Sequence, residues 1–254
     1  MVSSLQHLES EHPPKYPTKY RFKEVLDKGF VAITEISGCD ASIARDARVQ
    51  PESEWRPDKG DGGFNDERLL KTLMHSWPPH STPFEKTSLQ FWVKAPIFVY
   101  REWHRHRVWS FNEESARYKK LKPHFYVPEA KHVGVQSGSN HQSRDIDFES
   151  DGSSSRLHVD AMRGTYAHVY SVYTGLLNSG VPREIARSIL PVGVYSEMVA
   201  RVNLWNFFKF VELRNHKDAQ YEIQMYARAM YDLVKESGRF KHTLKLWETR
   251  GASK

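Results

Sequence analysis

The sequence predicts a fold that contains both β-strands and long α-helices. Residues 30–36 are rich in β-branched side chains, and apolar and polar side chains alternate over residues 87–94, as in strands with one buried face. Residues 162–177 and 219–234 instead place their apolar side chains on one face of a helix. Both kinds of element in one chain indicate a core built from strands and helices together.

Cap and turn residues predict where further helices begin. Asp40 is expected to be the N-cap of a helix over residues 40–49, and Asn65 the N-cap of the next helix. Pro96 suits the first turn of a helix that leads to Arg105. These helices lie on either side of the second predicted strand.

The 254 residues suffice for one large domain or two ordinary ones. Residues 1–17 are polar and rich in Pro, which predicts a flexible N-terminal arm, and residues 18–254 are expected to form a single domain. Residues 136–155 are poor in apolar side chains and dense in Ser, Asp and Gly. They are expected to form a surface-loop insertion rather than a linker between domains.

The composition favours a soluble, cytoplasmic protein with anionic partners. The formal net charge is +6, the pI is about 9.2 and the mean hydropathy is −0.66. The one cysteine, Cys39, excludes a disulfide within the chain and a zinc site with several thiolates, and no metal site is expected. The N-terminus lacks the pattern of a signal peptide, and no stretch approaches the roughly 20 apolar residues of a membrane span. No membrane partner is therefore expected.

Residues 105–118 carry the densest ligand-binding chemistry. Cation-capable groups, hydrogen-bonding groups and rings alternate in this stretch: Arg105, His106, Arg107, Trp109, Ser110, Phe111, Asn112, Glu113, Ser115, Arg117 and Tyr118. Guanidinium groups bind phosphate through paired hydrogen bonds and stack on rings, while amides and carboxylates bind ribose or base edges. This combination predicts a site for a nucleotide-like anion. A solvated, charged loop is the alternative that the residues alone leave open.

The spacing in this stretch resembles the signature of the flavin-dependent thymidylate synthases. Arg105-His106-Arg107 is followed by seven residues and then Ser115, and the match continues to Tyr118. Other segments resemble the same family in the same order: HSTPFE at 80–85, KAPIFV at 94–99, EIARSILP around Arg187, LR at 213–214 and AQYEI at 219–223. The similarity covers residues 30–229, with residues 136–155 poorly matched.

The resemblance implies a fold, an activity and an assembly. The fold would be α+β, with a mostly antiparallel sheet and long helices, assembled as a homotetramer whose active sites draw on several subunits. The activity would be reductive methylation of dUMP to dTMP, for which methylenetetrahydrofolate supplies the carbon. FAD would carry the reducing equivalents and NADPH would reduce it. A stable nucleic-acid partner is not expected.

The resemblance also implies which residues form the site. The residues expected to line dUMP are Glu102, Trp103, His104, Arg105, Glu113, Glu114, Ser115, Ala116, Arg117, Arg187 and Arg214. The residues expected to line FAD are Thr82, Arg105, His106, Arg107, Glu113, Asn203, Leu204, Trp205 and Lys209.

Arg214 is the expected catalytic residue. A fixed guanidinium at the amide edge of uracil stabilises negative charge there, which makes a ring carbon nucleophilic. Without the resemblance, a surface arginine paired with Glu212 or Asp218 would be favoured. Cys39 is not expected to act as a nucleophile, because no basic side chain adjoins it in the sequence.

Four positions depart from the family pattern. Glu102 stands where Gln is common, and its charge would repel a phosphate unless it is paired, for which Arg101 and Arg105 are the expected candidates. The other departures are Trp205 where Arg or His is frequent, Lys209 where Asn or His is frequent, and Gln50 where Ser is common. They leave details of the flavin contacts open.

Two other functions stay open at this level. A basic nucleic-acid-binding module is compatible with the pI and the arginine clusters, although Glu102, Glu113 and Glu114 interrupt the cations. A colourless protein with salt-sensitive RNA or DNA binding would favour that function. A flavoprotein acting on another nucleotide is the third possibility, which calorimetry with dUMP against other nucleotides would separate.

Overall fold

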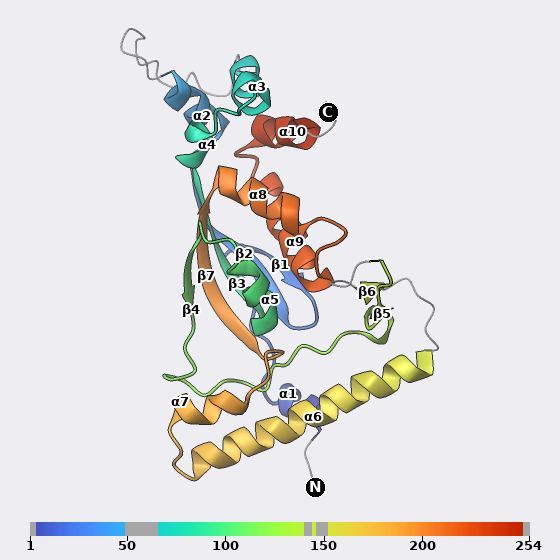
Figure 1. The fold of residues 1–254 in the computed structure, drawn as a ribbon. Helices are drawn as coiled ribbons and strands as arrows, with labels where there is room; N and C mark the ends of the chain where they lie inside the picture. Colours follow the sequence, from blue (N-terminus) through green and yellow to red (C-terminus); the bar gives the residue numbers. More distant parts are fainter. Residues whose placement is uncertain (1–3, 49–65, 140–143, 146–151, 251–254) are drawn as a thin grey trace.

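The computed structural model describes residues 4–48, 66–139, 144–145 and 152–250. At its centre is a five-stranded sheet in the order β1-β2-β3-β7-β4 (Figure 1). The strands are β1 (Arg21–Val25), β2 (Gly29–Ser37), β3 (Ser88–Pro96), β4 (Ser110–Glu113) and β7 (Tyr195–Asn203). Every neighbouring pair is antiparallel. The two strands predicted over residues 30–36 and 87–94 are confirmed as β2 and β3.

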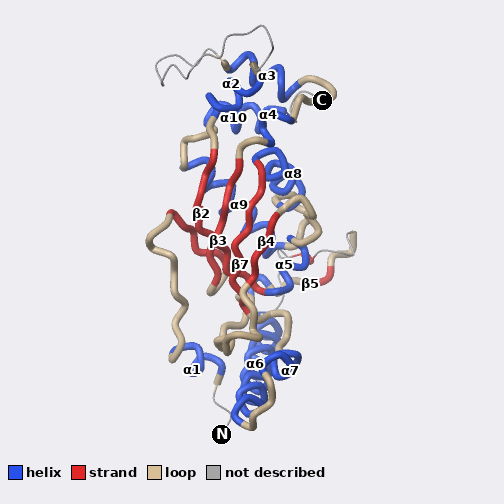
Figure 2. The backbone as a smooth tube through the Cα atoms, turned by 90° about the vertical axis from the view of Figure 1, so that its left-hand side faces the viewer, coloured by secondary structure: helices blue, strands red, loops and turns tan. Residues whose placement is uncertain are grey.

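The two faces of the sheet differ in what covers them. Leu89, Phe91 and Val93 alternate along β3 and are fully buried, as the period-two pattern predicts. The side chains between them point to the opposite face, where Trp92 is partly buried and its partner in register, Val199, is 38% exposed. Figure 2 looks toward this second face, where the described strands have no helix in front of them.

Helices α5 (Ile97–Trp103), α8 (Leu204–Arg214) and α9 (Tyr221–Glu236) cover the first face (Figure 1). α8 buries Phe207, Phe208 and Phe210 in the main apolar core, where Phe207 stacks on Phe91 of β3 and Phe210 on Trp103 of α5. Four more helices gather at one end of the sheet: α2 (Asp40–Ala47), α3 (Glu67–His75), α4 (Thr82–Glu85) and α10 (Lys241–Thr249). The predicted α+β class, with an antiparallel sheet and several helices, is therefore confirmed.

A second, smaller apolar cluster lies at the other end of the sheet, against α6 (Gly152–Asn178). α6 contains the predicted stripe over residues 162–177. α1 (Leu5–Ser10), α7 (Arg183–Ala186) and the short turns η1 (Ala130–His132) and η2 (Arg187–Ile189) complete this end. Of the helices that the structure describes, none is long and apolar enough to cross a membrane.

The N-terminal segment differs from the flexible arm predicted for residues 1–17. Within the described part, residues 4–17, Leu5 on α1 is only 3% exposed and belongs to the cluster around α6. The carboxylate of Glu9 lies 3.2 Å from Lys28 Nζ, which fixes the segment to the start of β2. Two leucines one turn apart are too short a pattern to predict this docking from the sequence.

The loop predicted over residues 136–155 also needs correction, because parts of it are anchored. Strand β5 (Val135–Gln136) pairs with β6 (Arg144–Asp145), and residues from Gly152 onward already belong to α6. Arg144 Nη2 lies 2.6 Å from Oε1 of Glu222, which is fully buried on α9. Arg144 thus neutralises a buried carboxylate, so this part of the segment is more than a solvated insertion.

Two local predictions fail for long-range reasons. Asp40 does not cap its own helix: its carboxylate accepts hydrogen bonds from the backbone N–H groups of His242 and Thr243, in the first turn of α10. A solvated loop, the alternative left open for residues 105–118, does not hold for residues 110–113, which form β4, an edge strand where polar side chains are tolerated. Asn65 and Gln50 lie outside the described residues.

Candidate active site

The C-terminal end of α8 meets the signature around Arg214. Its Nη1 donates to Glu102 Oε2 at 2.7 Å, its Nη2 to the Glu102 carbonyl oxygen at 2.9 Å, and its Nε to His106 Nε2 at 2.9 Å. The side chain is 13% exposed. All three guanidinium nitrogens thus have protein partners, which holds the group in one orientation. The alternative of a surface arginine paired with Glu212 or Asp218 is wrong.

His106 is neutral in this arrangement. Burial, together with the charge of Arg214, lowers the pKa of His106 to about 4. At neutral pH its ring carries one proton, and because Nε2 accepts from Arg214, that proton is on Nδ1. The ring also packs on Phe210, with centroids 5.0 Å apart. Among the described residues Nδ1 has no hydrogen-bond partner, so it can donate to a ligand.

Glu102 is paired, but not by the residues that the sequence suggested. Arg101 and Arg105 are its neighbours in the chain, whereas the actual partner, Arg214, comes from α8. The Glu102 carboxylate is 42% exposed, so this ion pair contributes only about 1 kcal/mol or less to stability. Its main effect is to orient the guanidinium and to neutralise a charge that would otherwise repel a phosphate.

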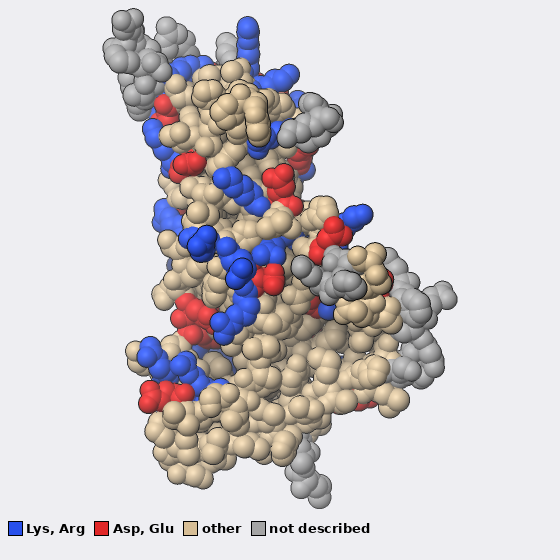
Figure 3. Space-filling model, in the orientation of Figure 1, with Lys and Arg blue, Asp and Glu red and all other residues tan. Residues whose placement is uncertain are grey.

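Arg105 and Arg107 follow α5 and are exposed. Among the described residues, neither side chain forms a hydrogen bond or an ion pair. Figure 3 shows Lys and Arg side chains gathered across the middle of the face that carries α5 and α8. Unpaired guanidinium groups beside a fixed one are suited to an anionic ligand.

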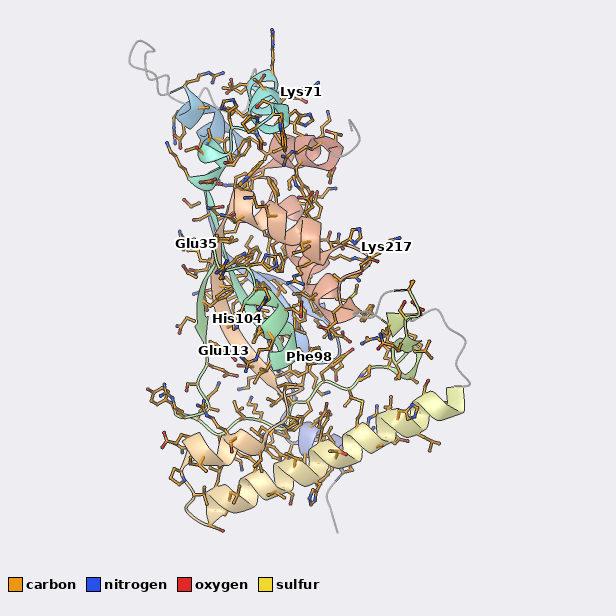
Figure 4. The ribbon with its side chains drawn as sticks, in the orientation of Figure 1. Glu35, Lys71, Phe98, His104, Glu113 and Lys217 are labelled. Atoms are coloured by element: carbon orange, nitrogen blue, oxygen red, sulfur yellow. The ribbon has the colours of Figure 1, made fainter. Side chains whose placement is uncertain are left out.

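The second half of the signature is held by β4 and β7. Glu113 Oε1 accepts from the Ser196 hydroxyl at 2.7 Å, and Glu114 Oε1 accepts from a backbone N–H of β7 at 3.0 Å. Figure 4 labels His104 and Glu113, which lie where α5 and β4 approach one another. The ring of His104 contacts that of Phe111 on β4, with centroids 4.7 Å apart. The strand therefore places two carboxylates next to the end of α5.

Ser115 and Arg117 follow β4 and lie against α7. The Ser115 hydroxyl accepts from the backbone N–H and from Nε of Arg117, both at 3.3 Å. Arg183 on α7 donates to the Tyr118 carbonyl at 3.4 Å. Arg187 begins η2, which directly follows α7, and is exposed with no side-chain partner among the described residues. A hydroxyl and two arginines thus belong to one end of the molecule, as a phosphate site requires.

The predicted flavin residues on α4 and α8 form a third group. Thr82 is the exposed first residue of α4, and Asn203 is the N-cap of α8, its Oδ1 accepting from a backbone N–H at 2.8 Å. Trp205 is 5% exposed, and two cations stand over its ring: Lys209 Nζ at 5.9 Å and Arg250 Cζ at 5.1 Å from the centroid. Sequence reasoning missed Arg250, because it lies beyond every segment that resembles the family.

Some predicted residues contribute little more than their backbone. Trp103 and Leu204 have fully buried side chains in the main core, and Ala116 is 8% exposed in the smaller cluster. Trp103 stacks on Phe210 at a centroid distance of 5.0 Å. These buried side chains fix the position of the neighbouring polar groups, and their own assignment to a ligand stays a prediction.

A buried pair near the uncovered face was not predicted. Lys94 Nζ lies 2.8 Å from His124 Nδ1, and both side chains are almost fully buried. Burial is the main cause that lowers the pKa of Lys94 to about 8 and that of His124 to about 4. Near neutral pH the lysine is charged and the imidazole is neutral. His124 Nε2 then donates to the carbonyl of His12, which ties the N-terminal segment to the sheet.

The structure does not bring all predicted site residues together. Trp205 and Arg214 stand at opposite ends of α8, about 13 Å apart along the helix axis at ~1.5 Å per residue. No contact among the described residues joins either of them to Arg187. Within one chain, the site consists of separated groups.

Comparison with known proteins places these groups in context. Residues 32–237 match the model of a family described as thymidylate synthase complementing protein. A flavin-dependent thymidylate synthase of Ruegeria pomeroyi is 39% identical over 219 residues, which cover 85% of this chain and 70% of the relative. That of Wolbachia pipientis wMel is 38% identical over 218 residues, covering 85% and 73%.

This chain belongs to the flavin-dependent thymidylate synthase family. Solved structures agree: the UMP/dUMP methylase PolB from Streptomyces cacaoi, bound with 5-Br UMP, is 32% identical and superimposes with a TM-score of 0.75. The similarity covers 90% of this chain and 97% of that one. PolB bound with 5-Br dUMP gives a TM-score of 0.76 at 33% identity, covering 89% and 97%. Family membership therefore rests on sequence and fold together.

Proposed function

We propose that this chain converts dUMP to dTMP by reductive methylation. The methyl carbon comes from methylenetetrahydrofolate, and NADPH supplies the electrons through bound FAD. Membership of the flavin-dependent thymidylate synthase family supports the reaction, and the similarity to a methylase crystallised with brominated UMP and dUMP supports a pyrimidine nucleotide as substrate.

The observation that carries this proposal is the fixed guanidinium of Arg214. Its hydrogen bonds to Glu102 and to neutral His106 use three N–H groups and leave two others on Nη1 and Nη2. Those two can bind the amide edge of uracil and stabilise the negative charge that develops there. Because its partners already orient the group, little reorganisation is needed in the transition state.

The phosphate of the nucleotide is assigned to the group beside α7. Arg117 and Arg187 fork onto phosphate oxygens, and the Ser115 hydroxyl donates its proton while it accepts from Arg117. Glu113 and Glu114, held by β7, are assigned to the sugar and base edges. Glu102 does not oppose this binding, because Arg214 neutralises its charge.

The chain's residues fit a flavin dinucleotide. Arg105 and Arg107 offer exposed guanidinium groups that no described residue pairs, and His106 offers the Nδ1–H donor. When bound, the flavin supplies two-electron chemistry that converts a methylene carbon to a methyl group. Cys39 is not needed for this reaction. It precedes α2, at the opposite end of the sheet from α6 (Figure 1).

The active form is a homotetramer in which each site takes groups from more than one chain. Each chain contributes a single domain over residues 18–254, with the described N-terminal segment docked on it. The separation of Arg214 from the phosphate group at Arg187 supports this assembly. The second sheet face supports it as well, because no described helix covers it and Val199 is exposed in the middle of β7.

The outer face of α6 is a second candidate for subunit contact. From Gly164 to Asn178 the helix contains no Lys, Arg, Asp or Glu. Gly164 and Gly175 lie inside the helix, where each costs about 1 kcal/mol relative to Ala, and a Cβ at either position would meet nothing within 4 Å in the chain itself. Close approach of another chain gives these glycines a structural reason.

Subunit complementation tests the shared site. Arg214→Ala and Arg117→Ala, each inactive alone, are unfolded together and refolded as a mixture. If one site takes Arg214 from one chain and Arg117 from another, about a quarter of the sites recover both groups, and activity returns. A mixture as inactive as its components would contradict sharing between these two groups.

The reaction itself is tested by product analysis. The protein is incubated with dUMP, methylenetetrahydrofolate, FAD and NADPH, and dTMP is measured by chromatography, with each component omitted in turn. UMP in place of dUMP gives the matched control for the sugar. Formation of dTMP that needs all four components is expected, and its absence from a folded, flavin-loaded protein would contradict the proposal.

A further inference from the structure

Two unpaired cations share one aromatic ring near the start of α8. Lys209 Nζ and Arg250 Cζ lie 5.9 Å and 5.1 Å from the centroid of the Trp205 ring, which packs on Phe84 of α4 at 5.7 Å. Neither cation forms an ion pair or a side-chain hydrogen bond with any described residue. An indole ring attracts a cation by its π face, but it carries no net charge. The cluster therefore has two positive charges without a counter-charge.

Two positive charges at one ring, neither of them paired with an acidic side chain among the described residues, indicate that an anionic ligand completes the site. The polar groups nearby suit the same ligand. The side-chain amide of Asn203 uses its oxygen to cap α8, which leaves two N–H donors free, and Thr82 adds a hydroxyl two residues before Phe84. These N–H and O–H groups are donors that phosphate oxygens can accept from.

Arg250 reaches this ring from the far end of the chain. It follows α10, beyond residue 237 where the match to the family model ends. The guanidinium over Trp205 therefore comes from a part of the chain that the family model does not match.

We propose that Arg250, together with Lys209, binds the diphosphate of the flavin dinucleotide. This inference rests on the proposed function, because it assumes that the flavin is FAD. Arg250 contributes the forked hydrogen bonds and Lys209 a point charge, while Trp205 serves as the platform that positions both.

The test compares FAD with riboflavin, which has the same ring system but no phosphate. Dissociation constants are measured by flavin fluorescence on the full-length protein, for wild type, Arg250→Ala, Arg250→Lys and the double variant Lys209→Ala/Arg250→Ala. Lys241→Ala is the matched control, since it removes one exposed positive charge from the same C-terminal helix. Thermal unfolding checks that each variant is folded.

Arg250→Ala is expected to weaken FAD about tenfold, as for one charge-assisted hydrogen bond, and to leave riboflavin unchanged. The double variant should weaken FAD further and reduce its dependence on salt, while Arg250→Lys should retain part of the affinity. Lys241→Ala should match wild type. Equal FAD affinity of wild type and Arg250→Ala, or an equal loss for riboflavin, would overturn the role of Arg250 while leaving the proposed function intact. A folded wild type that binds no FAD would overturn both.

Discussion

Replacing Arg214 with alanine should abolish turnover without unfolding the protein. The substitution removes hydrogen bonds to His106 and to the Glu102 carbonyl, each worth about 1 kcal/mol, and an ion pair of about 1 kcal/mol or less with the half-exposed Glu102 carboxylate. The total of about 2–3 kcal/mol is smaller than the roughly 5–15 kcal/mol by which domains are usually stable. The variant should therefore fold and take up FAD.

The effect on catalysis should be larger than the effect on substrate binding. Removing one preorganised electrostatic donor typically slows the chemical step about a hundredfold or more, which is about 2.7 kcal/mol of transition-state stabilisation. Because Arg214 is assigned to charge that develops during the reaction, kcat should fall while the KM for dUMP changes little. Arg214→Lys should recover only part of the rate, since lysine cannot make the forked contact.

The assay is dTMP formation at saturating dUMP, with FAD content and NADPH oxidation recorded on the same samples. Arg228→Ala is the matched control. Arg228 also forms side-chain hydrogen bonds, to Asn215 and Gln224, but it is not assigned to dUMP or to FAD. If Arg214→Ala turned over at nearly the wild-type rate, the assignment to uracil would be wrong.

Three further outcomes are expected. Cys39→Ser should keep full activity, since no cysteine nucleophile is needed. Its stability should be equal or higher, because Ser is a good N-cap for α2. Loss of dTMP formation by a folded, flavin-loaded variant would indicate that Cys39 acts as a nucleophile. The free energy of unfolding should fall as pH drops from about 6.5 to about 4, because His106 and His124 stay neutral in the folded chain while the unfolded chain takes up protons. For buried His124 the loss of stability across this window is on the order of 3 kcal/mol. Guanidinium unfolding across that window should show a shallower fall for His124→Gln, and an unchanged slope would contradict the pKa. Arg144→Ala should destabilise the protein by about 3 kcal/mol, because it leaves the Glu222 carboxylate buried without its ion-pair partner. A loss below about 0.5 kcal/mol in thermal or guanidinium unfolding would contradict the anchoring of residues 144–145 by this ion pair.

Local patterns predicted much of the fold. β3 was visible because one buried face imposes strict alternation on Leu89, Phe91 and Val93, and α6 because its stripe extends over four turns. Asp40 was assigned to the wrong helix, because a carboxylate can cap any helix that tertiary structure brings to it. The sequence contains no local sign of that partner.

In the candidate site, too, sequence patterns pointed to residues but not to the tertiary contacts that those residues make. The resemblance to the family pointed to His106 in the signature and to Arg214 in a separate segment. The partner of Glu102 could not be predicted, because it depends on how α5 and α8 pack. Trp205 is expected to line the flavin, but its contact with Arg250 could not be predicted, because Arg250 comes from beyond α10. Both contacts join residues far apart in the sequence, so only the folded chain shows them.

Release of tritium from dUMP labelled at the C5 position tests the central claim most directly, because methylation at that carbon must replace its hydrogen. With methylenetetrahydrofolate, FAD and NADPH present, tritium should enter water in proportion to the dTMP formed, and Arg214→Ala should lower both together. A folded, FAD-loaded wild-type protein that releases no tritium under these conditions would contradict the proposed reaction.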